Sequence, residues 1–183
     1  MELKRSVRLI LKTTDLTVNS STNIGTCNQY INIFTFNNIN LRMLMGDMYN
    51  QYDYFNLLLN TVSCSAAQAG LSEADRFIYI KMTGLPFINQ TYQQSTGNNG
   101  QYVYVTTYTL PTTAINTNQY YNNPANVITF NKNQDLCNLT FSLNRVSDDK
   151  TGSAILPNFT FFFTIVGIDT PDNPDRINQS LKL

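Results

Sequence analysis

Four basic residues lie within the first twelve positions of the chain: Lys4, Arg5, Arg8 and Lys12. The run from Leu3 to Lys12 alternates, so a β-strand would place Lys4, Arg8 and Lys12 on one face. Clustered cationic groups attract phosphates, which suggests an inward-facing surface near nucleic acid or anionic lipid. Because four charges give only weak, salt-sensitive binding, an ordinary solvated strand face is the simpler alternative.

Three tyrosines form a second candidate site. Tyr92, Tyr120 and Tyr121 stand among Asn and Gln in the two longest predicted loops, residues 86–100 and 110–126. Tyrosine supplies a large contact area at a low cost in conformational entropy, and it is therefore common in adaptable binding loops. The three are candidate binding-loop residues, and a plain solvated loop is the alternative.

Residue types that carry catalysis are scarce. The chain has no His, which excludes Ser-His and Cys-His nucleophiles and removes the commonest transition-metal ligand. Asp169, Asp172 and Asp175 do not have the spacing of a calcium-binding loop. Glu2 and Glu73 are the only glutamates, which makes a hydrolase with paired carboxylates a weak hypothesis. We expect no catalytic residue, cofactor or metal, and therefore no enzyme.

Net charge and cysteine content argue against two further classes, nucleic-acid-binding proteins and disulfide-stabilised secreted proteins. The formal net charge is 0 and the pI about 6.1, which argues against specific nucleic-acid binding because such proteins need a basic surface. Cys27, Cys64 and Cys137 lie far apart in the sequence and do not form a disulfide framework. We interpret them as buried, reduced thiols of a protein made in the cytosol.

The composition favours β-structure. The chain has 183 residues, which suits one domain with a sizeable core. Only 13% of the residues are charged, and 25 Asn and 22 Thr take up much of the polar fraction. Thr and Tyr are typical of sheet surfaces and Asn of loops, whereas helix surfaces favour Glu, Lys and Ala.

Eight strand-like runs account for most of the chain, with at most one short helix, at residues 47–51. The runs are residues 3–12, 29–47, 52–66, 76–84, 100–110, 126–132, 137–145 and 158–168. In the second run, Leu41, Met43 and Met45 are expected to continue an apolar strand face. Eight strands without alternating helices predict an all-β fold, a single antiparallel eight-stranded jelly-roll sandwich over residues 1–168. Residues 169–183 form a C-terminal extension, and no apolar run is long enough to be a transmembrane segment.

The last strand, "NFTFFFTIVGI", has apolar residues of both parities. Phe159, Phe161, Phe163 and Ile165 are expected to face the core. On the other face, Phe162, Val166 and Ile168 need a cover, which a neighbouring subunit, the long loops or the tail would supply. These three residues are the candidate subunit interface.

Three stretches together resemble a known family: "MLMGDMYNQYDYFNLLLNTV" at 43–62, "RFIYIKMTGLPFINQTY" at 76–92 and "LPNFTFFFTIVGI" at 156–168. They are similar to the single jelly-roll capsid proteins, penton or minor capsid, of large eukaryotic DNA viruses and virophages. The stretches are patterns of the fold and transfer no catalytic residue.

The resemblance implies a structural subunit of a virion, assembled in the host cytoplasm with the major capsid protein. A penton protein forming homopentamers at icosahedral vertices is the first hypothesis. A minor capsid protein that cements the same shell is the alternative within the class. A lectin-like or receptor-binding β-sandwich module is the alternative outside it.

Overall fold

The computed structural model describes residues 6–16, 25–28, 33–64, 77–86, 92–94, 101–110, 117–120, 127–132, 135–146 and 159–168. These ranges contain β-strands, two short α-helices and one 3-10 helix, η1. In chain order they are β1 (Ser6–Lys12), η1 (Thr13–Asp15), β2 (Gly25–Asn28), β3 (Ile33–Asn40), α1 (Leu41–Met45), α2 (Asp47–Gln51), β4 (Tyr54–Cys64), β5 (Phe77–Thr83), β6 (Tyr92–Gln94), β7 (Gln101–Thr109), β8 (Thr117–Tyr120), β9 (Val127–Asn131), β10 (Leu136–Arg145) and β11 (Phe159–Ile168).

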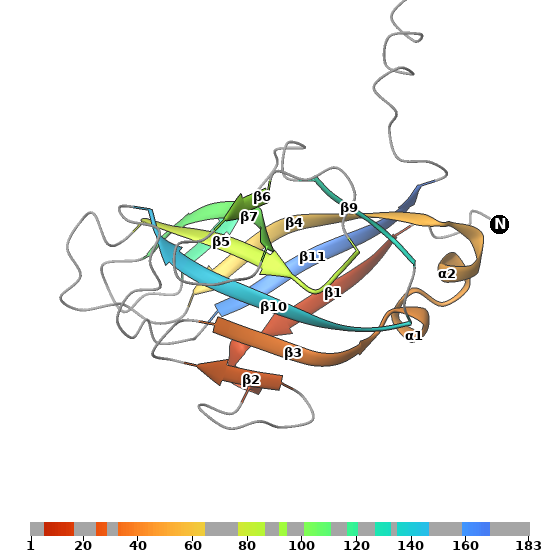
Figure 1. Ribbon diagram of the computed structural model, residues 1–183, viewed down its shortest axis with the longest axis horizontal. Coiled ribbons are helices and arrows are strands. Elements are labelled where there is room, and N and C mark those ends of the chain that lie inside the picture. Colours follow the sequence, from red (N-terminus) through yellow and green to blue (C-terminus); the bar gives the residue numbers. More distant parts are fainter. Residues whose placement is uncertain are drawn as a thin grey trace, which may run out of the picture.

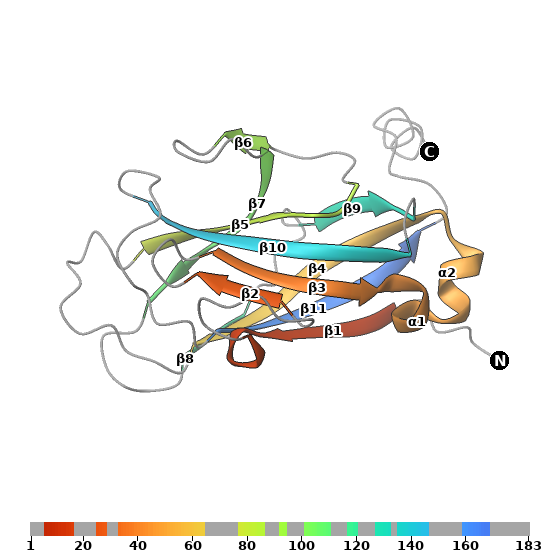
Figure 2. The same cartoon turned by 60° about the horizontal axis from the view of Figure 1, so that its bottom comes forward.

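The strands form two antiparallel sheets that lie in two layers (Figures 1 and 2). Sheet A has the order β1-β11-β4, and β8 and β9 both pair with the remaining edge of β4. Sheet B has the order β2-β3-β10-β5-β7-β6. The prediction of an all-β sandwich is confirmed, and each of the eight predicted runs contains one strand.

The strand order is that of a jelly roll. Numbered in chain order, the eight predicted strands are β1, β3, β4, β5, β7, β9, β10 and β11. Sheet A then joins the first, eighth, third and sixth, and sheet B joins the second, seventh, fourth and fifth. Each sheet therefore combines strands from both halves of the chain, as two interlocked Greek keys require. The short strands β2, β6 and β8 extend this framework.

The core lies between the layers, and β11 supplies its centre. Buried and half-buried residues alternate along the whole of β11, as the parity of its phenylalanines predicts. Phe161 of sheet A stacks on Phe141 of sheet B, with 4.7 Å between ring centroids and 7° between ring planes. This contact ties the two sheets together directly. The inward residues of β11 are Phe159, Phe161, Phe163 and Ile165.

The strand face predicted at Leu41, Met43 and Met45 is wrong, because these residues form α1. The side-chain oxygen of Asn40 accepts a hydrogen bond of 2.8 Å from the backbone nitrogen of Met43, and so caps the helix. In a helix, residues four apart share a face, and the residue midway between them points to the other side. Leu41 and Met45 are buried, whereas Met43 is 84% exposed.

Two cysteines can be placed in the core. Cys64 and Cys137 are buried thiols, as predicted, and burial raises the pKa of Cys137 to about 12. This thiol therefore stays protonated and unreactive at neutral pH. Cys27 belongs to β2, and its side chain lies outside the described residues.

A polar network fastens α2 to the chain between β9 and β10. The Tyr49 hydroxyl donates a hydrogen bond of 2.6 Å to Oδ1 of Asp135, and Arg42 pairs with the same carboxylate at 3.4 Å. Lys132 pairs with Asp53 at 2.8 Å. Burial, and then the contact with Asp135, raise the pKa of Tyr49 to about 12. The network closes the end of the sandwich at which α1 and α2 lie (Figure 1).

The raised pKa of Tyr49 predicts a stability change at alkaline pH. Its neutral form stabilises the fold fully below pH 10, and this contribution is lost as the pH rises toward 12. We expect Tyr49→Phe to lower the free energy of unfolding by about 1–2 kcal/mol at pH 8, because a hydrogen bond to a carboxylate is lost. The difference from the wild type should shrink above pH 10. Urea denaturation of both proteins between pH 8 and pH 11.5 tests this, and a constant difference would contradict it.

Candidate interaction surface

A β-bulge lies on the outward face of sheet A, at the centre of β4. Phe162 of β11 is opposite Thr61, but the next residue, Phe163, is opposite Leu59. Asn60 is therefore an extra residue in β4. Both Asn60 and Thr61 consequently face outward, whereas Leu59 and Val62 on either side of them are buried. Asn60 donates a hydrogen bond of 2.9 Å from Nδ2 to the hydroxyl of Thr164 on β11.

Four outward residues form one row across sheet A. Ile10 is opposite Phe162, Phe162 is opposite Thr61, and Thr61 is opposite Tyr120. Residues directly opposite each other in antiparallel strands share a face, so the row runs from β1 through β11 and β4 to β8. Its two ends are open to solvent, since Ile10 is 49% and Tyr120 is 70% exposed. We call these four residues the outer row.

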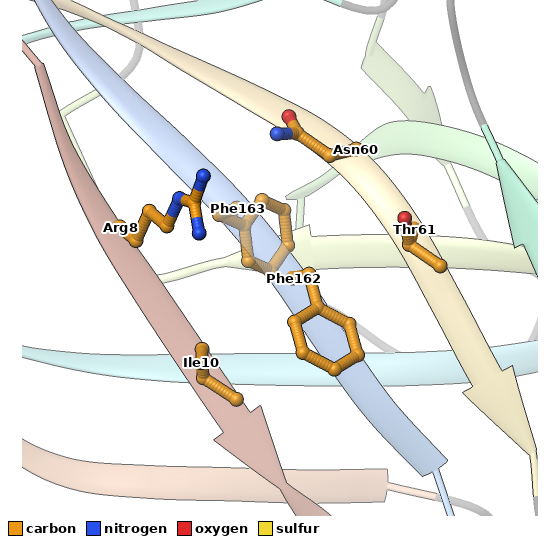
Figure 3. Close-up of a pocket in the computed structure, with 6 residues that line it drawn as sticks. All are labelled: Arg8, Ile10, Asn60, Thr61, Phe162 and Phe163. Carbon is orange, nitrogen blue, oxygen red and sulfur yellow. The ribbon is translucent and has the colours of Figure 1, made fainter.

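A pocket of about 240 Å³ lies along the outer row. In Figure 3, Arg8 and Ile10 extend from β1 on one side and Asn60 and Thr61 from β4 on the other, with Phe162 on β11 between them. A β-bulge interrupts the regular hydrogen-bond ladder between two strands. The pocket lies at the bulge, since Asn60 and Thr61 line it. The pocket is lined by Arg8, Ile10, Asn60, Thr61, Phe162 and Phe163.

Cationic groups border this pocket. Arg8 and Lys12 are exposed on β1, one on each side of Ile10 along the strand. Among the described residues that face outward on the five strands of sheet A, none is Asp or Glu. The ion pairs Arg42–Asp135 and Lys132–Asp53 lie at the α1–α2 end. Among the described residues, the outward strand faces of sheet A therefore combine apolar area with positive charge, which suits a partner that is apolar and acidic.

The structure brings together residues that the sequence assigned to different sites. Phe162, Val166 and Ile168, the candidate interface, are all half-buried and face outward on β11. Arg8 and Lys12 of the basic face lie beside them, while Lys4 and Arg5 lie outside the described residues. The outer face of sheet A therefore combines the predicted interface with part of the predicted basic face.

The tyrosines separate. Tyr120 lies on β8 and Tyr92 on β6, so both belong to short edge strands, and their prediction as loop residues is wrong. Tyr120 pairs within sheet A and Tyr92 within sheet B. Tyr121 lies outside the described residues. The bulge that brings Tyr120 into one row with Phe162 has no signal in the sequence. For Ile10, the only sequence signal is that it shares a strand face with Arg8 and Lys12.

The outward face of sheet B differs, because polar residues there are buried. Ser142 and Asn144 lie on the parity of β10 that faces away from the core, yet both are fully buried. The Ser142 hydroxyl donates a hydrogen bond of 2.7 Å to Oδ1 of Asn144. Lys81, opposite Ser142 on β5, is also fully buried, with Nζ 5.7 Å from the ring centroid of Tyr79. Lys81 and Asn144 have further polar or ring contacts. A buried ammonium group requires such partners, so this face is built as an interior.

The part of the chain that the structure describes shows neither a metal centre nor a membrane-spanning helix. No group of three or more Cys, Asp or Glu residues within it is placed to hold a metal ion. None of its helices has the length and apolar character needed to cross a membrane.

Comparison with known proteins finds a likeness among solved structures but none in sequence. No protein-family model matches the chain, and no curated protein matches it. Among solved structures, the crystal structure of selenomethionine-labelled mavirus penton protein matches at 18% sequence identity, with a TM-score of 0.33. The match covers 52% of this chain and 36% of the penton chain. A TM-score of this size is too low to support an assignment, so the fold rests on the strand order alone.

Proposed function

We propose that the protein is a structural subunit of a viral capsid, and specifically a penton protein that forms homopentamers at the vertices of an icosahedral shell. It has no catalytic role in this proposal. Its partners are further copies of itself and the major capsid protein, and it resides in the virion after assembly in the host cytoplasm.

The strand order is the observation that carries the proposal. A jelly roll in which β1, β11, β4 and β9 face β3, β10, β5 and β7 is an architecture of viral capsid and lectin domains. The outer row adds a reason to expect assembly, because a sheet face with Ile10 and Tyr120 exposed beside a pocket has apolar area to bury. The sequence resemblance to single jelly-roll capsid proteins favours the capsid over the lectin.

The penton role predicts a defined mass. We expect the purified protein to form a species of five times 20.8 kDa by size-exclusion chromatography with light scattering. Val166→Glu should raise the dissociation constant of the pentamer at least tenfold. Val166 is half-buried on the outward face of β11, and assembly would bury an unpaired carboxylate there. Met43→Glu, on the exposed face of α1, is the matched control and should leave the mass unchanged. A monomer at high concentration, with no density at fivefold positions of the particle, would exclude the penton role.

The lectin-like module is favoured by one observation, the exposed Tyr120 at the end of the outer row. Tyrosines are common anchors in ligand-binding surfaces. A glycan array, together with attachment assays on a Tyr120→Ala, Tyr121→Ala variant, separates the two functions. Absence of glycan binding and unchanged attachment would count against the lectin.

A further inference from the structure

The edge of sheet A formed by β1 is open in the part of the chain that the structure describes. Within that part, β1 pairs with β11 alone, and no other backbone hydrogen bond involves Ser6–Lys12. We propose that this edge binds an added β-strand from a different protein, in which a central apolar residue has a carboxylate two residues before it and two residues after it. This goes beyond the proposed function, because the site is the edge of the sheet and the partner is not a copy of this chain.

The first step is the backbone of β1, which lies at the border of its layer (Figure 2). In an antiparallel pair, alternate residues of each strand direct their N–H and C=O groups away from the partner strand. β1 therefore presents a row of such groups on the side away from β11. Leu9 and Leu11 are buried and hold β1 in the sandwich, so an added strand finds the edge already formed.

The second step is the outward side chains of β1. Arg8, Ile10 and Lys12 are all exposed on this face, with the isoleucine between the two cations. Residues two apart in a strand are about 6.6 Å apart, and directly opposite residues of neighbouring strands are about 5 Å apart. The proposed strand therefore places its apolar side chain beside Ile10 and its carboxylates beside the cations. Its pattern is the same in both chain directions, so a parallel and an antiparallel strand both fit.

The third step is charge. At the α1–α2 end, two ion pairs neutralise the cations of the described chain. Arg8 and Lys12, in contrast, lie on a sheet whose described outward residues include no Asp or Glu. Exposed ion pairs contribute little affinity, so the carboxylates serve to select the partner. Main-chain hydrogen bonds and burial of Ile10, which is 49% exposed, supply the affinity.

The same charges argue against a second copy of this chain as the partner. Two β1 strands that met edge to edge in antiparallel register about Ile10 would set Arg8 of one copy against Lys12 of the other, and opposed like charges destabilise a strand pair. No two Asp or Glu residues are four positions apart in the sequence, so no segment of these 183 residues carries the pattern. A phosphate polymer would match the cations, but it has neither an apolar group for Ile10 nor amides for the edge. A strand of another protein supplies all three.

Fluorescence anisotropy with a labelled synthetic peptide tests the proposal. The probe is Thr-Glu-Thr-Ile-Thr-Glu-Thr with blocked ends, and the same peptide with Lys in place of Glu is its control. We expect the glutamate peptide to bind at least tenfold more tightly than the lysine peptide, and the double variant Arg8→Glu, Lys12→Glu to reverse this preference. Both residues are exposed, so their replacement leaves the core intact. Met43→Glu, on the exposed face of α1, is the matched protein control and should bind as the wild type does.

N-methylation of the glutamate peptide distinguishes strand pairing from attraction by charge alone. Only alternate amides of an added strand face the strand that it joins. N-methyl groups on one set of alternate residues should therefore abolish binding, whereas N-methyl groups on the other set should leave it nearly unchanged.

Three outcomes would overturn the proposal. Equal or undetectable binding of the glutamate and lysine peptides means that the edge does not select an acidic strand. Binding that both N-methylated peptides retain means that the cations attract an anionic polymer or surface without strand pairing. A preference for glutamate that survives in Arg8→Glu, Lys12→Glu means that the peptide binds elsewhere. The penton role is decided by the assembled mass alone, so the two proposals can fail separately.

Discussion

Replacement of Phe161 by alanine is expected to lower the free energy of unfolding by about 3–5 kcal/mol, the usual cost of removing a fully buried aromatic ring. Phe161 has no exposed surface, and it stacks on Phe141 across the two sheets. Its neighbours on the same face of β11, Phe159 and Phe163, lie with ring centroids at 6.1 Å and 6.5 Å. The resulting cavity would lie at the centre of the core, where surrounding strands are least free to close it.

Phe162 provides the matched control, one position along the same strand. It faces outward and is half-buried, so Phe162→Ala should cost only about 1–2 kcal/mol. Chemical denaturation of the wild type and both variants gives the two differences. Equal losses would contradict the assignment of faces on β11. They would mean that the outward side of the sheet is as tightly packed as the core.

This contrast shows which part of the fold a sequence can predict. On β1 and β11 one parity is apolar throughout and the other is partly polar, and the apolar parity is the one that turns to the core of a sandwich, so the core face follows from the sequence. The eight main strands and their sandwich were predicted on this basis. A short helix such as α1 has no such signature, since Leu41, Met43 and Met45 fit a strand equally well. Its formation depends on the cap at Asn40.

The candidate site was less predictable because it depends on register between distant strands. Phe162 and Tyr120 were separate candidates in the sequence, and they share a row only because Asn60 is an extra residue in β4. A β-bulge places two residues of one strand opposite one residue of the neighbouring strand, so its position cannot be read from the sequence of either strand alone. The burial of Lys81 and Ser142 on an outward face likewise depends on residues remote in sequence. Alternation predicts the side of the sheet but not what lies above it.

Replacement of Gly84 by alanine is the second change expected to have a large effect, of at least about 3 kcal/mol. A Cβ at this position would lie 1.8 Å from the backbone oxygen of Asn138 and 2.9 Å from its carbonyl carbon. Gly84 also has φ +111°, a conformation that residues with a side chain rarely adopt. Since the atoms it would meet belong to the backbone of β10, relief requires the strand itself to move.

Movement of β10 would also disturb its other edge. The pairing of β10 with β3 shifts register between Cys137 and Leu139, which leaves Asn38 in a left-handed conformation at φ 56°. The side-chain oxygen of Asn138 accepts a hydrogen bond of 2.8 Å from the backbone nitrogen of Asn38. Displacement of Asn138 by a methyl group at Gly84 would therefore strain two strand contacts of sheet B together.

Gly46, between α1 and α2, separates the effect of backbone strain from the effect of the steric clash. It has φ +57°, but a Cβ there would meet no atom within 4 Å, so Gly46→Ala carries the backbone strain alone, about 1–2 kcal/mol. We expect thermal and urea denaturation to show a clearly larger loss for Gly84→Ala, and similar losses would mean that β10 yields to the methyl group without cost. The "MTGLPF" stretch of the sequence thus gains a physical reason for its glycine: at Gly84, the end of β5 approaches β10 too closely for any side chain.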